Sequence, residues 1–154
     1  MMGDKNMTAS STSQSAQPQE GHALTRAGED YLESIYRLSR ESVEADHSVR
    51  SVDVADQLEV SKASVNKAVT MLKETGMVEQ CRYGCITLTE KGEKYARSVW
   101  RSHRALRAFL EHDLGVTPET ADEEACLMEH VLSDDTMQRL ISYLEKQGVE
   151  IPTE

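Results

Sequence analysis

Apolar residues recur at intervals of three and four over most of the chain after residue 24, which is the spacing of amphipathic helices. The first such segment predicts a helix over about residues 25–41, which Thr25 can cap. Its apolar stripe consists of Tyr31, Leu32, Ile35, Tyr36 and Leu38. Residues 42–50 are polar and predict a loop. Residues 1–22 are rich in Ser, Thr, Gln and Gly and have almost no large apolar side chains, so they cannot offset the entropy of ordering and predict a disordered tail.

Residues 52–76 predict a helix-turn-helix. A short helix is indicated by Val52, Val54, Ala55 and Leu58. The Glu59-Val60 pair predicts a tight turn, and Ser61 is typical of an N-cap for a second helix that ends at Gly76. The buried side of this second helix would carry Val65, Ala68, Val69 and Leu72.

The outward side of the second helix is small, polar and basic, with no acidic residue before Glu74. It consists of Lys62, Ala63, Ser64, Asn66, Lys67 and Thr70, with Lys73 near the end. Such a surface fits the major groove of DNA, where short polar side chains and amides contact base edges and lysines neutralise phosphates. Sequence recognition is assigned to Ser61, Ala63, Ser64, Asn66 and Lys67.

Residues 77–89 predict two short strands around a Tyr83-Gly84 turn, and a hairpin directly after a helix-turn-helix is typical of a winged helix. Arg82 at the tip of this wing could contact a DNA phosphate or be an ordinary exposed turn residue. Cys81 and Cys85 could approach each other as a redox pair. A CxxxC spacing is a weak signal, however, and small residues in a wing more often serve packing.

Three further helices are predicted after the wing. Thr89 can cap a long helix over about 90–113, Thr117-Pro118 is typical of the start of another, and Ser133 can cap the last. The last helix has an apolar stripe of Met137, Leu140, Ile141 and Leu144. So little chain remains to cover that stripe that we expect a homodimer.

The predicted fold class is mainly α with a small β-hairpin wing. We expect a winged helix-turn-helix DNA-binding domain over residues 23–96 and a helical dimerisation and metal-binding domain over residues 97–147. Residues 148–154 would form a tail.

Charge is distributed unevenly over the 154 residues. The net charge of −10 by itself argues against a nucleic-acid partner. Residues 111–154, however, contain twelve Asp and Glu against only Arg139 and Lys146, whereas residues 1–110 contain fifteen residues of each sign. The two parts are therefore expected to have different functions, with DNA bound by the balanced N-terminal part.

The sequence shows no apolar run long enough to span a membrane and no apolar segment typical of a signal peptide. Its three cysteines, Cys81, Cys85 and Cys126, do not form a disulfide framework. These features predict a protein of the reducing cytoplasm.

Three metal-capable side chains are close together in the segment from Cys126 to His130. On a helix, Cys126, Glu129 and His130 would share one face because they are spaced i, i+3 and i+4. Taken alone, this pattern is more often a buried cysteine beside a surface Glu-His pair. Asp30 and Glu33 are three residues apart on the first helix and could equally be solvated surface acids. His103, beside Trp100 on the long helix, is a further candidate, although a lone histidine there is usually structural.

Several segments together resemble the diphtheria-toxin-repressor family of metal-dependent transcriptional repressors. They are Glu29–Tyr36, the helix-turn-helix Val52–Gly76, the Tyr83-Gly84 wing with Ile86–Thr89, and Met128–Asp134, and they follow in the family's order between about residues 24 and 147. The resemblance implies a homodimer that binds a pseudo-palindromic DNA operator. It also implies a divalent metal, Mn²⁺ or Fe²⁺, that bridges the two domains, and repression of metal-uptake genes.

By length, the chain is similar to the manganese-transport-regulator branch, because it stops where the iron-sensing branch has an SH3-like domain. The resemblance implies that Asp30, Glu33, His103, Glu129 and His130 are metal ligands, since they match ligand positions of that branch.

The sixth ligand position departs from the manganese branch. Cys126 stands where that branch has a bridging carboxylate, and it matches the cysteine of the iron branch's primary site. A thiolate favours Fe²⁺, Co²⁺, Ni²⁺ or Zn²⁺, whereas the hard oxygen of Asp30, where the iron branch has a thioether, favours Mn²⁺. Arg107 replaces a glutamate of the iron branch's ancillary site. Whether one or two metals bind each subunit stays open.

Two alternatives to a metal-dependent regulator are consistent with parts of the sequence. A winged-helix regulator without metal would keep the DNA-binding surface but would not need the ligand set. A zinc enzyme could use Glu129 as a base, but it requires a substrate cleft that a helical dimer with a wing does not suggest. We expect no enzymatic activity, and metal-dependent DNA binding would discriminate among the three.

Overall fold

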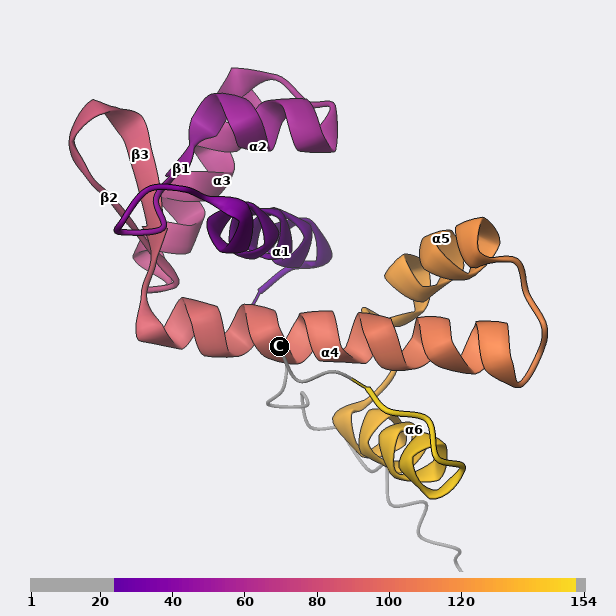
Figure 1. Ribbon diagram of the computed structural model, residues 1–154. Coiled ribbons are helices and arrows are strands. Elements are labelled where there is room, and N and C mark those ends of the chain that lie inside the picture. The colour runs from indigo at the N-terminus through magenta and orange to yellow at the C-terminus, as the bar shows by residue number, and fades with distance from the viewer. Residues whose placement is uncertain (1–23, 152–154) are drawn as a thin grey trace, which may run out of the picture.

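The computed structural model describes residues 24–151, so the predicted tail 1–22 and the end 152–154 lie outside the described residues. Figure 1 shows a winged-helix unit at one end of a long helix and two shorter helices at its other end. The elements are α1 (Arg26–Glu41), β1 (Val49–Arg50), α2 (Ser51–Leu58), α3 (Lys62–Glu74), β2 (Val78–Gln80), the 3₁₀ turn η1 (Arg82–Gly84), β3 (Cys85–Leu88), α4 (Glu90–His112), α5 (Pro118–Met128) and α6 (Asp134–Lys146). The predicted fold class is confirmed.

The predicted helix caps are confirmed by side-chain hydrogen bonds. Thr25, Ser61, Thr89, Thr117 and Ser133 each accept a hydrogen bond from the backbone N–H three residues later. Each such bond satisfies an amide that the first helical turn leaves unpaired. Glu59 adopts a left-handed conformation (φ 54°) after α2, which makes the tight turn between the two helices of the helix-turn-helix.

The sheet has three strands in the order β1-β3-β2, all antiparallel. The predicted hairpin is therefore present, but the prediction that residues 42–50 form only a loop was wrong. Val49 is buried and pairs with Ile86, so the end of this segment adds a third strand. A strand of two residues is too short to show the alternation by which strands are predicted.

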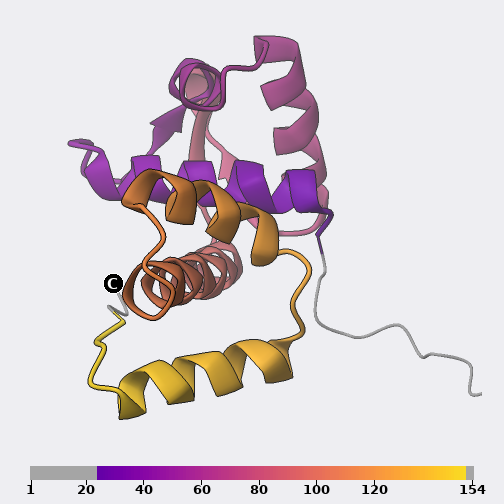
Figure 2. The same cartoon turned by 90° about the vertical axis from the view of Figure 1, so that its right-hand side faces the viewer.

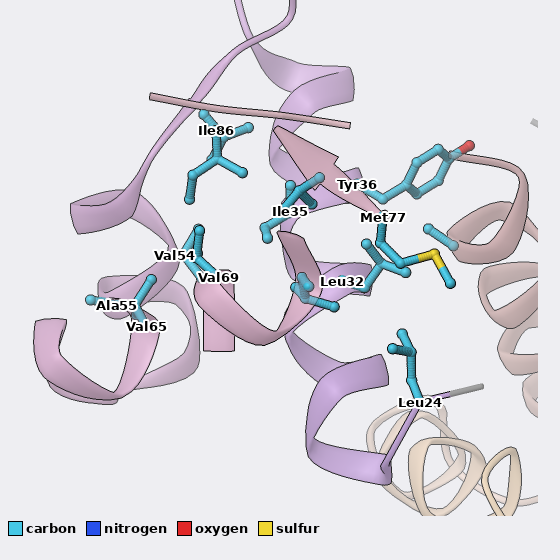
Figure 3. Close-up of a cluster of buried hydrophobic side chains, with 14 residues drawn as sticks. Leu24, Leu32, Ile35, Tyr36, Val54, Ala55, Val65, Val69, Met77 and Ile86 are labelled. Carbon is cyan, nitrogen blue, oxygen red and sulfur yellow. The ribbon is translucent and has the colours of Figure 1, made fainter. Parts of the chain in front are cut away.

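The winged-helix unit is held together by a core from all of its elements. Figure 3 shows Leu32 and Ile35 of α1 among side chains from α2, α3 and β3, and none of these is appreciably exposed. Full burial of such a side chain contributes about 1.5–3 kcal/mol. The position of α1 is consequently fixed relative to α3.

Helix α4 connects this core to a second one. At its C-terminal half, α5 and α6 lie on opposite sides of it, as both views show (Figures 1 and 2). The second core contains Leu106 of α4, Ala121 of α5 and Leu144 of α6. Ile151, in the segment expected to be a tail, is also buried there. None of the helices within residues 24–151 combines the length and apolar composition needed to cross a membrane.

Gly92 of α4 permits the close approach of the wing to this helix. A Cβ atom at this position would lie 1.8 Å from the Met77 carbonyl oxygen and 2.7 Å from its carbon. That carbonyl also accepts hydrogen bonds from the N–H and hydroxyl of Thr89, so it is held in place.

We expect Gly92→Ala to lower the free energy of unfolding by about 1–3 kcal/mol or more, because backbone rather than a flexible side chain must move. Thermal unfolding would measure the change. Gly28→Ala is the matched control, since its Cβ would meet only side-chain atoms, Met71 Cε and Thr25 Oγ1 at 3.3 Å each and Leu24 Cβ at 3.5 Å, and a helical alanine gains propensity. An unchanged melting temperature for Gly92→Ala would contradict the fixed approach.

Candidate metal centre and DNA-binding surface

The predicted metal ligands meet where α1, α4 and the C-terminal end of α5 pack together. Among residues 24–151, two groups have potential ligand atoms within 4.8 Å of one another, and Glu129 belongs to both. The first group is Asp30, Cys126, Glu129 and His130, and the second is Glu33, His103 and Glu129. The structure therefore brings all six predicted residues together, from segments that are up to 100 residues apart.

Local helix geometry aims these side chains at one another. Asp30 and Glu33 lie three residues apart on α1 and face α4 and α5. The expectation that Cys126, Glu129 and His130 share one helix was only partly correct, because α5 ends at Met128. Glu129 is the C-cap, with helical angles (φ −58°, ψ −28°) and its N–H bonded to the Ala125 carbonyl. The backbone thus stays helical at Glu129, so its side chain lies on the same face as that of Cys126.

The centre contains two buried carboxylates. Glu33 is 9% exposed and Glu129 is 5% exposed. Burial, followed by the negative charge of Glu129, raises the pKa of Glu33 to about 8. One oxygen of Glu129, Oε1, is buried without a hydrogen-bond partner among the described residues. A cation at this position would satisfy that oxygen and compensate the charge, so the residues present fit a divalent metal.

His103 is fixed at both ring nitrogens. Its Nδ1 lies 2.9 Å from Glu129 Oε2, its Nε2 lies 3.0 Å from Asp122 Oδ1, and its ring stacks on Trp100 with centroids 5.2 Å apart. Burial alone would lower the pKa of His103, but the hydrogen bonds to the two carboxylates outweigh it and raise the pKa. Asp122 was missed by the sequence analysis. Its position four residues before Cys126 on the same helix face is the signal that could have indicated it.

His130 is held by a second carboxylate that the sequence analysis missed. Its Nε2 faces the first ligand group, 3.0 Å from Asp30 Oδ1 and 3.3 Å from Glu129 Oε1. Its Nδ1 contacts Glu29 Oε2, and the Tyr95 hydroxyl donates to the other Glu29 oxygen at 2.6 Å. Burial, followed by the hydrogen bond to Glu29, raises the pKa of Tyr95. Glu29 is only 3% exposed. Its burial could have been predicted from the sequence, because it lies three residues before the apolar Leu32 on the same helix face.

Cys126 is half-buried at the edge of the first group. Burial raises the pKa of its thiol to about 11, and the neighbouring carboxylates, Glu129 foremost, add to the shift. Its ligation to a metal would therefore release a proton. Arg107, the departure from the iron branch, is bound to Glu111 at 2.6 Å and lies 3.3 Å from Asp122.

The predicted DNA-binding residues of α3 form an exposed surface on the opposite side of this helix from its core residues. Ser61, Lys62, Ala63, Ser64, Asn66 and Lys67 are all exposed. The hydroxyls of Ser61 and Ser64 lie 2.9 Å apart, and Ser61 also caps the helix. Arg82 lies in the turn between β2 and β3, at the tip of the wing.

Two family models match consecutive parts of the chain. The N-terminal DNA-binding domain of iron-dependent repressors matches residues 23–86, and their metal-binding and dimerisation domain matches residues 89–149.

Curated relatives match over most of the chain. An uncharacterized HTH-type transcriptional regulator of Methanocaldococcus jannaschii is 35% identical over 123 residues, which cover 80% of this chain and 96% of that protein. Transcriptional regulator MntR of Escherichia coli O157:H7 is 36% identical over 79% of this chain and 76% of its own length. The iron-dependent repressor IdeR of Mycobacterium tuberculosis is 33% identical over 79% of this chain, which spans only 51% of IdeR.

Solved structures with a similar fold are consistent with the sequence matches. The manganese regulator SloR superposes with a TM-score of 0.67 at 32% identity, covering 79% of this chain and 55% of that one. A hypothetical protein from Sulfolobus solfataricus gives a TM-score of 0.63 at 26% identity, over 84% of this chain and 99% of that chain. Sequence, fold and ligand cluster thus agree, and the chain belongs to the diphtheria-toxin-repressor family of iron-dependent repressors.

Proposed function

We propose that this protein is a transcriptional regulator whose binding to double-stranded DNA depends on a divalent metal, Mn²⁺ or Fe²⁺. In the cytoplasm it would repress metal-uptake genes when loaded with metal. The observation that carries the proposal is that the ligand cluster joins α1, which is part of the winged-helix core, to α4 and α5. The family match also excludes the enzyme alternative, because the matched models describe repressors.

When bound, the cation supplies positive charge and coordination bonds that compensate the buried carboxylates. Asp30 and Glu33 would hold it from α1, His103 from α4, and Cys126, Glu129 and His130 from the end of α5. Leu32 and Ile35 pack α1 against the helix-turn-helix, so an α1 fixed to α4 and α5 also fixes the orientation of α3. Metal can shift the protein toward the arrangement that binds DNA only if it binds that arrangement more tightly than the others.

The DNA-contacting surface of each subunit would be the exposed side of α3 together with the wing. Lys62 and Lys67 would neutralise phosphates, and Asn66 would contact a base edge. Leu127 (53% exposed) and Val131 (75% exposed) are apolar side chains beside the metal centre, and they suit an interface between two copies of the chain. A dimer with two-fold symmetry would bind a pseudo-palindrome.

The proposal is tested by fluorescence anisotropy with the DNA upstream of its own gene, under anaerobic conditions and at fixed salt. We expect the dissociation constant to fall at least tenfold when chelator is replaced by Mn²⁺ or Fe²⁺. Glu33→Gln should lose this response. Glu41→Gln, at the exposed end of the same helix, is the matched control and should keep it. Equal binding with chelator and with metal would instead support a metal-independent winged-helix regulator.

Cys126 is expected to set the preference among metals. We predict that Cys126→Glu raises the affinity for Mn²⁺ relative to Fe²⁺ and Zn²⁺, because a carboxylate oxygen is a harder ligand than a thiolate. Competition titrations with a fluorescent chelator would measure the ratio. Cys126→Ser removes the thiolate without adding a carboxylate and is the control. If neither variant changes the order of metal affinities, Cys126 is a structural thiol.

Glu29 is expected to act through His130. A carboxylate on Nδ1 keeps the proton there and leaves Nε2 free to bind metal, and loss of such a contact typically weakens metal binding about 10–100-fold. We predict a dissociation constant for Mn²⁺ about tenfold higher in Glu29→Gln and a smaller increase in Tyr95→Phe. Titration calorimetry measures affinity, and thermal unfolding of the metal-free protein is the control. A lower melting temperature with unchanged metal affinity would assign Glu29 a purely structural role.

A further inference from the structure

Cys81 and Cys85 lie directly opposite each other at the end of the wing. The pairing of Gln80 with Ile86 continues by one position to the two cysteines, and the Cys81 N–H donates to the Cys85 carbonyl at 2.9 Å. The Cys81 thiol donates to the same carbonyl at 3.2 Å. Opposed residues of antiparallel strands have Cα atoms about 4.5–5.5 Å apart, and disulfides span about 4.4–6.8 Å. The Cys81 N–H bond to the Cys85 carbonyl is typical of a hydrogen-bonded pair, whose usual Cα separation of about 5.5 Å lies within the range that disulfides span.

Both cysteines have solvent-exposed surface. Both cysteines are free, Cys81 is exposed, and Cys85 is half-buried. Cys85 also lines a surface hollow of about 820 Å³ together with Arg50 and Asp53. Arg50 is the residue opposite Cys85 on the neighbouring strand, and Asp53 holds its guanidinium at 2.7 and 2.8 Å. A small oxidant thus has access to the pair without unfolding of the sheet.

The three residues that the pair encloses form the tip of the wing. Tyr83 and Gly84 both have positive φ (68° and 75°), which folds the chain back on itself and brings the cysteines opposite each other. The side chain of Tyr83 is fully exposed. A bond between the two sulfurs would replace the thiol–carbonyl contact and constrain this tip.

We propose that Cys81 and Cys85 are a reversible dithiol–disulfide pair that makes DNA binding by the wing sensitive to low-molecular-weight disulfides. The thiolate of one cysteine attacks a sulfur of oxidised glutathione and releases one glutathione thiolate. The other cysteine, after loss of its proton, attacks the mixed disulfide and releases the second glutathione. Two protein thiols are oxidised to one disulfide, and one glutathione disulfide is reduced to two thiols.

The covalent step can be tested independently of DNA. Trypsin cleaves after Lys73, Arg82 and Lys91, so the cysteines fall on separate peptides, 74–82 and 83–91. After the full-length protein is treated with oxidised glutathione, we expect these two peptides to be linked by one disulfide. The protein should run as a monomer on a non-reducing denaturing gel, and dithiothreitol should separate the peptides. Unlinked peptides, single glutathione adducts or a disulfide between two chains would overturn the proposal.

The effect on DNA rests on the proposed function and is measured separately, by anisotropy with Mn²⁺-loaded protein. We expect oxidation to raise the DNA dissociation constant at least threefold, with recovery in dithiothreitol, because the bond displaces the thiol from its carbonyl and shifts the tip. Cys81→Ser should bind DNA equally before and after treatment. A loss that persists in Cys81→Ser would assign the effect to modification of Cys85 or Cys126 alone and would overturn the role of the pair. An unchanged affinity of the oxidised wild type would remove the DNA-binding part of the proposal. If the reduced, metal-loaded protein binds no DNA, the proposed function fails while the peptide result still stands.

Discussion

The burial of Glu129 is the constraint on which the metal centre depends. This carboxylate is shared by both ligand groups, and its Oε2 is bound by His103 while its Oε1 has no hydrogen-bond partner among the described residues. A buried carboxylate with an unsatisfied oxygen is costly unless a proton or a cation compensates it. Glu33 is also buried, and its burial together with the negative charge of Glu129 raises its pKa and so disfavours its charged form. A cation bound at the proposed centre would therefore stabilise the protein.

Helix α4 connects the two halves of the molecule, because it packs against both hydrophobic cores. Its N-terminal part packs on the wing and α1, and its C-terminal part lies between α5 and α6 (Figure 2). His103 lies on α4 between the two cores and stacks on Trp100, which packs against the first core. The proposed ligands from α1 and from the end of α5 lie beside it. Charge compensation by a cation there would thus act on the orientation of α3, although none of the proposed DNA-contacting residues is a proposed ligand.

Most of the fold followed from local signals, and the misses share one cause. Helix caps such as Ser61 and Thr117 are set by neighbouring residues, so the sequence predicted them correctly. Strand β1 and the early end of α5 were not predicted, because pairing with β3 and packing on α4 decide them. Glu29 and Asp122 escaped notice for the same reason, since each acts on a histidine far away in the chain. The ligand set itself came from the family resemblance rather than from spacing, which for Asp30 and Glu33 was equally consistent with surface acids.

The three cysteines illustrate how position decides the chemistry of a side chain. Burial, and then the neighbouring carboxylates, raise the pKa of the Cys126 thiol, so a bound cation would favour its thiolate, and the softness of the thiolate would influence which cation is selected. Cys81 and Cys85 lie outside the metal centre, accessible to solvent and opposite each other on a hairpin. Coordination of a cation by Cys126 is favoured by the carboxylates beside it, whereas thiol–disulfide exchange needs access for the attacking group. The chain thus separates the two proposed kinds of sulfur chemistry, with the candidate metal ligand Cys126 between the two cores and the solvent-accessible pair on the wing.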